Sequence, residues 1–266
     1  MENFRTIYLH HKKEKQTQEQ VDEISTTAKK YGFMLTNEHK QADIIICFGD
    51  DGNFLHGVRK TGFRSSCLYV GMSNTDSPGI YTNFSYRNVQ SFFSLLKENS
   101  FDFVRFPLLE VSINNEPPAL CLNETVVRSS IIKTLAIDVY IDNHFFEHYQ
   151  GDGLIVSTPS GSTGYNKSTK GAVTDPELPC LQLTELAPLT NKSSNSLGSS
   201  LILNQNRTLI LEIKQDGNDH PIIGLDNEAY SIRNIQSLLV RLSNRSIQTV
   251  NNPEFSYWDN ITAIFL

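Results

Sequence analysis

One stretch of the sequence decides the fold of the N-terminal part of the chain: Asp43-Ile44-Ile45-Ile46-Cys47-Phe48-Gly49-Asp50-Asp51-Gly52-Asn53. Its first half is a continuous apolar, β-branched run, which is typical of a strand buried on both faces of a parallel sheet. Its second half is a glycine loop that directly follows the strand. Because ligands bind outside the carboxyl ends of the strands in open α/β sheets, we expect this loop to bind a ligand.

Short apolar runs and helical periodicity alternate around this stretch and predict a Rossmann-like α/β domain with a parallel sheet over residues 1–100. Further strands are expected at residues 7–9, 33–35 and 67–70. Apolar residues at helical spacing predict helices over residues 21–31 and 89–96, and a short helix that begins near residue 54.

From residue 101 the pattern changes to short β-rich segments separated by turn signals, which predicts an antiparallel β-sandwich domain over residues 101–250. The expected strands are residues 101–106, 108–113, 120–127, 131–141, 144–149, 154–157, 201–203, 208–213, 221–225, 230–235, 237–242 and 246–250. Residues 179–186 are expected to form a short helix, and Asp216-Gly217 a turn. The last segment, residues 251–266, is apolar enough to need a partner surface on the N-terminal domain or a neighbouring subunit.

Composition and charge exclude several classes of protein. The chain has 266 residues, of which 39% are hydrophobic, and a formal charge of −6, which argues against general affinity for nucleic acid or an anionic membrane. The cysteines at 47, 67, 121 and 180 lack metal-ligand spacing, so we expect buried, reduced thiols. No apolar run is long enough to span a bilayer and no N-terminal signal core is visible, so a cytoplasmic protein is expected.

The first glycine loop carries two adjacent carboxylates, Asp50 and Asp51. Such neighbours repel each other unless they diverge, are solvated or meet a cation, so we expect at least one to face a ligand. Glycine lets backbone amides approach a polyphosphate closely, and a carboxylate there can accept a proton from an attacking hydroxyl. A purely structural tight turn uses the same residues and is the alternative.

Two further elements carry polar groups in unusual density or place. Residues 151–166 join Asp152, flanked by glycines, to a strand and then to a Ser/Thr/Gly turn that ends in Tyr165 and Asn166, groups that can bind a sugar and stack on a base. An ordinary loop with Tyr165 against the sandwich core is the alternative. Asn123 and Glu124 interrupt an apolar strand, and we favour a ligand-facing pair over a bulge or a solvated strand end, because burial without partners is costly.

At these three elements together the sequence resembles the NAD kinase family. Members carry a Gly-Gly-Asp-Gly loop after an early strand, an Asn-Glu pair in the middle of the chain, and a Gly-Asp-Gly…Ser-Thr-Pro-Ser-Gly-Ser-Thr-Ala-Tyr-Asn-x-Ser signature. The corresponding residues here are 49–52, 123–124 and 151–168. The chain is most similar to the second paralogue of low-GC Gram-positive bacteria, including residues 216–228.

The resemblance implies a two-domain fold and a reaction. A phosphoryl group would pass from ATP, or polyphosphate, to the 2′-hydroxyl of the adenosine ribose of NAD with Mg²⁺ or another divalent cation, and Asp51 would be the general base. The residues implied to surround the dinucleotide are Gly52, Asn53, Asn123, Glu124, Gln150, Asp152, Ser160, Thr163, Gly164, Tyr165, Asn166, Lys167, Ser168, Ala187, Asp226 and Asn227. No metal ligand is assigned, and a homodimer or homotetramer is implied.

The chain departs from the family pattern at four positions. Asp50 replaces the second glycine, Asn53 a threonine, Gly164 an alanine, and Gln150 an arginine of the close relatives. Asp50 and Gln150 both make the expected site less positive, which disfavours substrates made of phosphates. The alternative function is therefore a degenerate paralogue that binds NAD or NADP as a sensor or regulatory subunit with little kinase activity.

Overall fold

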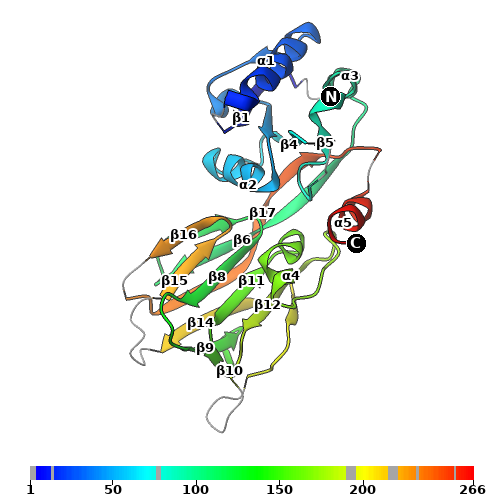
Figure 1. Cartoon of the computed structure of the whole chain (residues 1–266). Helices are drawn as coiled ribbons and strands as arrows, with labels where there is room; N and C mark the ends of the chain where they lie inside the picture. Colours follow the sequence, from blue (N-terminus) through cyan, green and yellow to red (C-terminus); the bar gives the residue numbers. More distant parts are fainter. Residues whose placement is uncertain are drawn as a thin grey trace. The chain divides into compact units, whose positions relative to one another are not determined.

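The computed structural model describes residues 4–12, 15–75, 79–189, 196–214, 221–231, 234–254 and 256–266. The chain forms two compact units (Figure 1). Unit 1 combines Met1–Phe106 with Ser246–Leu266, and unit 2 is Pro107–Arg245. The C-terminal segment therefore belongs to the same unit as the N-terminal residues.

Unit 1 is built on a parallel sheet, as the sequence predicts. Its strands follow the order β2 (Met34–Leu35), β1 (Thr6–His11), β3 (Ile44–Phe48), β4 (Leu68–Ser73). Beside β4, Gln248 and Thr249 of β17 (Ser237–Val250) add a further parallel pairing. Every residue of β3 is buried, which explains why its sequence is apolar throughout instead of alternating.

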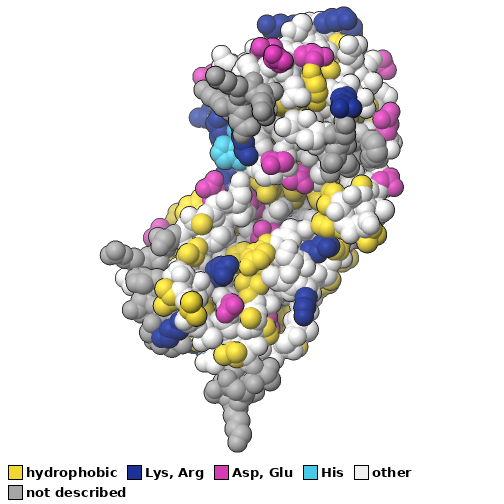
Figure 2. Space-filling view, in the orientation of Figure 1, with side chains coloured by type: hydrophobic (Ala, Val, Ile, Leu, Met, Phe, Trp, Pro, Cys, Tyr) yellow, Lys and Arg dark blue, Asp and Glu magenta, His cyan; other side chains and the backbone are white. Residues whose placement is uncertain are grey.

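Helices and short elements complete unit 1. They are α1 (Lys15–Lys30), η1 (His39–Gln41), α2 (Asp51–Lys60), β5 (Phe84–Ser85), η2 (Tyr86–Asn88), α3 (Val89–Glu98) and α5 (Tyr257–Phe265). The apolar stripes of α1 and α3 form one core with the sheet, in which Ile24, Ile46 and Phe93 are fully enclosed. The helix α5 differs, because Trp258 and Ile264 on it and Leu266 just after it are exposed, and hydrophobic side chains show on it in Figure 2.

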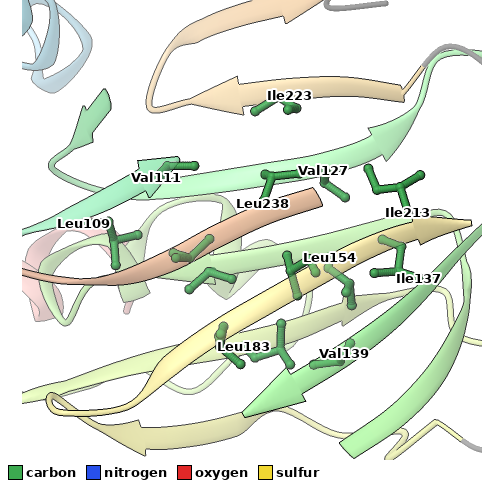
Figure 3. Close-up of a cluster of buried hydrophobic side chains, with 14 of the residues drawn as sticks. Leu109, Val111, Val127, Ile137, Val139, Leu154, Leu183, Ile213, Ile223 and Leu238 are labelled. Atoms are coloured by element: carbon green, nitrogen blue, oxygen red, sulfur yellow. The ribbon is translucent and has the colours of Figure 1, made fainter. Parts of the chain in front are cut away.

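Unit 2 is an antiparallel β-sandwich. One sheet has the order β13 (Leu201–Asn204), β12 (Cys180–Leu186), β11 (Gly153–Ser157), β8 (Glu124–Ser129), β15 (Pro221–Leu225), β16 (Glu228–Ser231). The other contains β10 (His144–Gly151), β9 (Leu135–Ile141), β14 (Thr208–Lys214) and β17, with β6 (Phe103–Ile113) on β17 and β7 (Ala119–Cys121) on β6. Side chains from both sheets, among them Val127, Leu154, Ile137 and Leu238, gather into one core (Figure 3).

The structure corrects several predicted elements of unit 2. Residues 180–186 form a fully buried strand, β12, instead of a helix, because alternate leucines fill the sandwich core. The strand predicted over 120–127 is two strands with a break at Leu122 and Asn123. Pro107 lies inside one continuous strand, β6, and residues 237–250 are also one strand. The predicted strand over 131–141 begins only at Leu135. Of the strand predicted over 230–235, residues 230 and 231 lie in β16, and residues 232 and 233 lie outside the described residues.

Other expectations concern the cysteines, a turn and membrane spans. The four cysteines are buried thiols that form no disulfide, as predicted. The predicted turn at Asp216-Gly217 lies outside the described residues. Within the described part of the chain, no helix has the length and apolar character that crossing a membrane requires.

Candidate active site

The first glycine loop ends β3 and begins α2, and Asp50 is the N-cap of that helix. Its backbone is extended, and its carboxylate oxygen Oδ1 accepts a hydrogen bond from the Asn53 amide at 2.7 Å. An aspartate at this position satisfies an otherwise unpaired helix donor and interacts favourably with the helix dipole. The structure thus gives Asp50 a folding role that the comparison with the family motif did not predict.

Asp51, the next residue, has its carboxylate surrounded by hydrogen-bond donors from the segment 80–82. Oδ2 accepts from the Ile80 amide at 2.7 Å, and Oδ1 accepts from the amides of Tyr81 and Thr82 and from the Thr82 hydroxyl at 3.0 to 3.1 Å. An ionised carboxylate accepts only, at about four lone-pair positions. Among the described residues, three of these donors therefore share Oδ1 and one reaches Oδ2, so Oδ2 is the less occupied of the two oxygens.

Two glycines let the backbone come close enough to make these contacts. A Cβ on Gly79 would lie 2.3 Å from Asp51 Oδ1, and a Cβ on Gly71 in β4 would lie 2.0 Å from the Tyr81 carbonyl oxygen. Neither distance is compatible with a side chain. The segment 79–82 is therefore pressed between β4 and the start of α2, which fixes the orientation of Asp51.

In unit 2, the break between β7 and β8 is clamped by Asp226. This carboxylate accepts from the amides of Leu122 at 3.0 Å and Asn123 at 2.7 Å, and the Asp226 amide donates to the Glu124 carbonyl at 2.9 Å. Asp226 sits in the turn between β15 and β16 with φ at 53°. It therefore positions the Asn123-Glu124 pair through the backbone.

The other side of the same break is held by the turn that follows β11. The Thr158 amide donates to the Asn123 carbonyl, and the Thr158 hydroxyl donates to the Leu122 carbonyl at 2.7 Å. Gly161 lies so close that a Cβ would stand 2.0 Å from the Asn123 oxygen. Gly161 thus lets this turn lie close to the backbone of Asn123.

Glu124 has a buried carboxyl group in an unusual environment. Burial, followed by the negative charge of Asp226, raises the pKa of Glu124 to about 8, although the Tyr165 amide donates to it. Its Oε2 atom has no hydrogen-bond partner within the described structure. A Cβ on Gly164 would lie 2.9 Å from Oε2. Glycine in place of the alanine of the family motif therefore leaves space at this oxygen.

A cavity of about 490 Å³ opens in unit 2 beside these residues. Its lining residues are Arg128, Asp152, Tyr165, Ser168, Thr169, Lys170, Thr184, Glu185, Leu186, Ala187, Pro188, Gly198, Ser199 and Ser200. The volume suits a small molecule. Two basic side chains, Arg128 and Lys170, and two acidic ones, Asp152 and Glu185, stand among its lining residues.

The wall of this cavity at residues 198–200 is fixed by two buried glutamates. Glu185 accepts from the Gly198 amide and Glu147 accepts from the Leu197 amide at 2.7 Å. Burial raises the pKa of Glu147, and the neighbouring Glu185 raises it further, against the opposing effect of the Leu197 amide. Glu147 and Glu185 thus hold residues 197–198 through their backbone amides, and Glu185 also lines the cavity.

Comparisons with known proteins identify the family of this chain. Residues 122–252 match the family model for the ATP-NAD kinase C-terminal domain. The chain is 45% identical over 262 residues to NAD kinase 2 of Bacillus subtilis, covering 98% of each chain. It is 43% identical over 266 residues to NAD kinase 2 of Halalkalibacterium halodurans, covering 100% of each. The chain belongs to the NAD kinase family.

Solved NAD(H) kinase structures share the fold. Yeast NADH kinase, complexed with NADH, aligns with a TM-score of 0.82 and 18% identity over 98% of this chain and 86% of that one. An NAD kinase from Archaeoglobus fulgidus, in complex with ATP, aligns with a TM-score of 0.77 and 22% identity over 98% of this chain and 99% of that one. The likeness confirms the predicted two-domain NAD kinase fold.

The structure groups the residues that the NAD kinase motifs predict into three sets. Asp51, Gly52 and Asn53 begin α2 in unit 1. Asp152, Tyr165, Ser168 and Ala187 line the cavity of unit 2. The remaining predicted residues lie elsewhere in unit 2: Asn123 and Glu124 at the strand break, Gln150 in β10, Ser160 and Thr163 in η3 (Ser160–Thr163), Gly164 after it, Asn166 and Lys167 in α4 (Tyr165–Ser168), and Asp226 and Asn227 in the β15–β16 turn.

Three of the predicted contact residues are enclosed by protein groups. The side-chain Nδ2 of Asn53 donates to the Phe48 carbonyl, and Ser160 lies buried against the Thr158 hydroxyl. The Asn166 side chain donates to the carbonyls of Ser162 and Ala172 and accepts from the Thr184 hydroxyl. Asn53, Ser160 and Asn166 thus hold the conformation of the loops that also carry the exposed residues of the NAD kinase motifs.

The prediction missed several residues of the cavity, including Arg128, Lys170 and Glu185. A signal for Arg128 was present, because Glu124, Val126 and Arg128 alternate along β8 and so share one face of the strand. Glu185 could not be found, because residues 179–186 were interpreted as a helix. With β12 as a strand antiparallel to β11, Glu185 is paired with Leu154, which follows the Asp152 motif.

Proposed function

We propose that the chain is an NAD kinase that transfers the γ-phosphoryl group of ATP to the 2′-hydroxyl of the adenosine ribose of NAD. The ribose oxygen forms a bond to the γ-phosphorus while the bond from that phosphorus to the β–γ bridging oxygen breaks, so that ADP leaves and NADP is formed. The observation that carries the proposal is the carboxylate of Asp51, held by four donors, of which, among the described residues, three reach Oδ1 and one reaches Oδ2.

Asp51 would act as the general base. A secondary hydroxyl is a poor nucleophile at neutral pH, and a carboxylate within hydrogen-bond distance can accept its proton as the new bond forms. The proton would pass to Oδ2 and then to water. The fixed segment 79–82 supports this role, because a base whose orientation is set beforehand loses little freedom when the substrate binds.

The dinucleotide would bind in unit 2. Tyr165, 37% exposed, offers a ring face for stacking, and Arg128 and Lys170 offer charge for the phosphates. Asn123 and Glu124 would bind hydroxyl or base groups, since Glu124 carries a proton at neutral pH and can both donate and accept.

The divalent cation would bind mainly to the nucleotide. Within the described residues there is no group of three or more His, Cys, Asp or Glu side chains that could hold a metal ion. Mg²⁺ commonly uses one or two carboxylates together with substrate phosphates, and the exposed Asp50 fits that need. When bound, Mg²⁺ would neutralise charge on the β- and γ-phosphates.

The test is NADP formation by the purified protein with NAD and Mg²⁺, with ATP or polyphosphate as donor and Asp51→Asn as the blank. Asp51-dependent product establishes the reaction and its donor. Absence of product from a protein that binds NAD in calorimetry would refute the kinase and favour the sensor.

We propose in addition that the protein is a homodimer or homotetramer. The exposed apolar side chains of α5, and Phe145 on the edge strand β10, support an interface between copies. Size-exclusion chromatography with light scattering measures the assembly, and a monomer at micromolar concentration would refute it.

A further inference from the structure

Tyr149, in β10, is a buried residue of unit 2 that the sequence motifs do not include. Its side chain is fully enclosed, and its hydroxyl donates to the Leu186 carbonyl and accepts from the Gly153 amide at 2.8 Å. Burial raises the pKa of Tyr149, so the phenol keeps at neutral pH the proton that it donates. A Cβ on Gly151 would lie 2.2 Å from the phenol oxygen, so only glycine fits at position 151 beside this hydroxyl.

The Tyr149 hydroxyl joins the two sheets of the sandwich. Tyr149 belongs to the sheet that contains β9 and β14, whereas Gly153 begins β11 and Leu186 ends β12 in the other sheet. The chain passes from the first sheet to the second at residues 151–153. One phenol therefore holds this crossing to the end of β12.

Asp152 stands at the centre of the crossing. Its amide donates to the Leu186 carbonyl at 2.9 Å, and its carbonyl accepts from the Ser129 amide at 3.1 Å. The Leu186 carbonyl thus accepts from the Asp152 amide and from the Tyr149 hydroxyl. The Asp152 side chain itself is exposed and lines the cavity of unit 2. The phenol therefore fixes the backbone from which this carboxylate projects.

Asp152 depends on such support because its side chain is short. A single methylene group separates the carboxylate from the backbone, so a shift of the backbone moves the acceptor oxygens by nearly the same distance. A carboxylate in the cavity can accept hydrogen bonds from the hydroxyl and amide groups of a dinucleotide. These bonds weaken steeply as distance and angle depart from their optimum, so the position of the Asp152 backbone should affect affinity.

We infer that Tyr149 is a positioning residue for the dinucleotide, whose hydroxyl holds Asp152 in place while the ring stays buried behind the cavity wall. The inference rests on the proposed NAD site in unit 2 and deepens it, because it makes the affinity of that site depend on a residue outside its lining.

Tyr149→Phe removes the hydroxyl and keeps the ring. The Kd for NAD, measured by calorimetry, should rise about five- to tenfold, the usual effect of losing one hydrogen bond, and kcat should stay within about threefold of the wild-type value. An unchanged Kd in folded Tyr149→Phe protein overturns the inference. Because Kd is measured without turnover, a wild-type protein that binds NAD but forms no NADP refutes only the kinase. A wild-type protein that binds no NAD refutes the proposed site and the inference with it.

Tyr69→Phe, in β4 of unit 1, is the matched control. The Tyr69 ring is also fully enclosed, and its hydroxyl shares a hydrogen bond with the Thr61 hydroxyl and accepts from the Arg64 amide at 3.0 Å. Loss of this hydroxyl should lower Tm by a similar amount but leave the Kd for NAD within about twofold of the wild-type value. An equal rise of Kd in the two variants would mean that lost stability weakens binding, and it would overturn the inference.

A double-mutant cycle and a measurement on the wild-type protein complete the test. In an Asp152→Ala background, Tyr149→Phe should raise the Kd by less than about twofold, because the group that the phenol positions is gone. The full five- to tenfold rise in that background contradicts the inference. If Tyr149→Phe does not fold, hydrogen exchange decides: NAD should slow exchange in the wild-type peptide that contains residues 149–154, and unchanged exchange there with NAD bound overturns the inference.

Discussion

Two acidic pairs, Asp50 with Asp51 in unit 1 and Glu124 with Asp226 in unit 2, use the same chemical groups for different purposes. All four carboxylates accept from backbone amides, but in each pair one of them holds the end of an element: Asp50 caps α2, and Asp226 holds two amides of the strand break. The other members differ, because Asp51 is half-buried among four donors, whereas Glu124 is buried beside a negative charge with a raised pKa. The number of donors and the degree of burial thus distinguish Asp51, the proposed base, from Glu124, whose pKa is raised by burial.

The largest effect that we expect is on kcat when Asp51, the proposed base, is replaced. Asp51→Asn should lower kcat by about 10² to 10⁴-fold, the usual contribution of general base catalysis. The Kd for NAD should stay within about threefold of the wild-type value, since the residues proposed to bind NAD lie in unit 2. Steady-state kinetics and calorimetry measure both. A kcat within about twofold of wild type would remove Asp51 from the mechanism.

Asp226 tests whether a carboxylate can act through the backbone alone. Asp226→Asn keeps one acceptor and replaces the other by a donor that faces an amide, so the free energy of unfolding should fall by about 1 to 3 kcal/mol. KM for NAD should rise about tenfold, because the Asn123-Glu124 pair is displaced.

Asp142→Asn is the control, since Asp142 also has a positive φ and accepts from the backbone amide of Thr208 in another turn of unit 2. This variant should leave KM for NAD unchanged. Equal effects of the two substitutions on KM would mean that Asp226 stabilises the fold and does not position the pair.

Glu124 should make the stability of the protein depend on pH. Its folded-state pKa of about 8 lies above the reference value of 4.5, so the folded state binds the proton more tightly than the unfolded state. The free energy of unfolding should therefore fall as pH rises from about 5 to 8, and Glu124→Gln should make this decline shallower. Denaturant titrations across that range measure the slope.

The same titration should appear in substrate binding. We expect KM for NAD to rise a few-fold above about pH 8, as ionised Glu124 adds negative charge beside Asp226 and near the phosphates. Glu124→Gln should bind NAD nearly as well at pH 7 and should not show the rise. A parallel rise in both proteins would assign the titration to another group.

The smallest effect concerns the cap. Asp50→Ala should lower the free energy of unfolding by about 1 kcal/mol, because the Asn53 amide loses its acceptor, whereas Asp50→Asn should be close to neutral. Denaturant unfolding of the two variants tests this. Identical stability of wild type and Asp50→Ala would mean that the cap contributes nothing, and the negative charge at position 50 would then need another explanation.

The sequence predicted the α/β unit because β3 and β4 are buried along their whole length and the helices carry clear apolar stripes. It failed at residues 180–186, where a short run of leucines fits both periods and only the neighbouring strands β11 and β13 decide between them. It also missed the contacts of Asp51 with residues 80–82 and of Asp226 with residues 122–123, because about thirty and one hundred residues separate the partners. The local sequence pattern located the motifs, but tertiary contacts determine the burial and the hydrogen-bond partners of each carboxylate.

The uneven hydrogen bonding of the two Asp51 carboxylate oxygens bears on the regioselectivity of the proposed transfer. A ribose presents two adjacent hydroxyls of nearly equal acidity, and a freely accessible carboxylate would deprotonate either. If Asp51 is the base, three donors on Oδ1 leave Oδ2, with one donor among the described residues, to receive a hydroxyl from one side. The choice between the two positions is then made by the angle at which the sugar arrives and not by the reactivity of its oxygens.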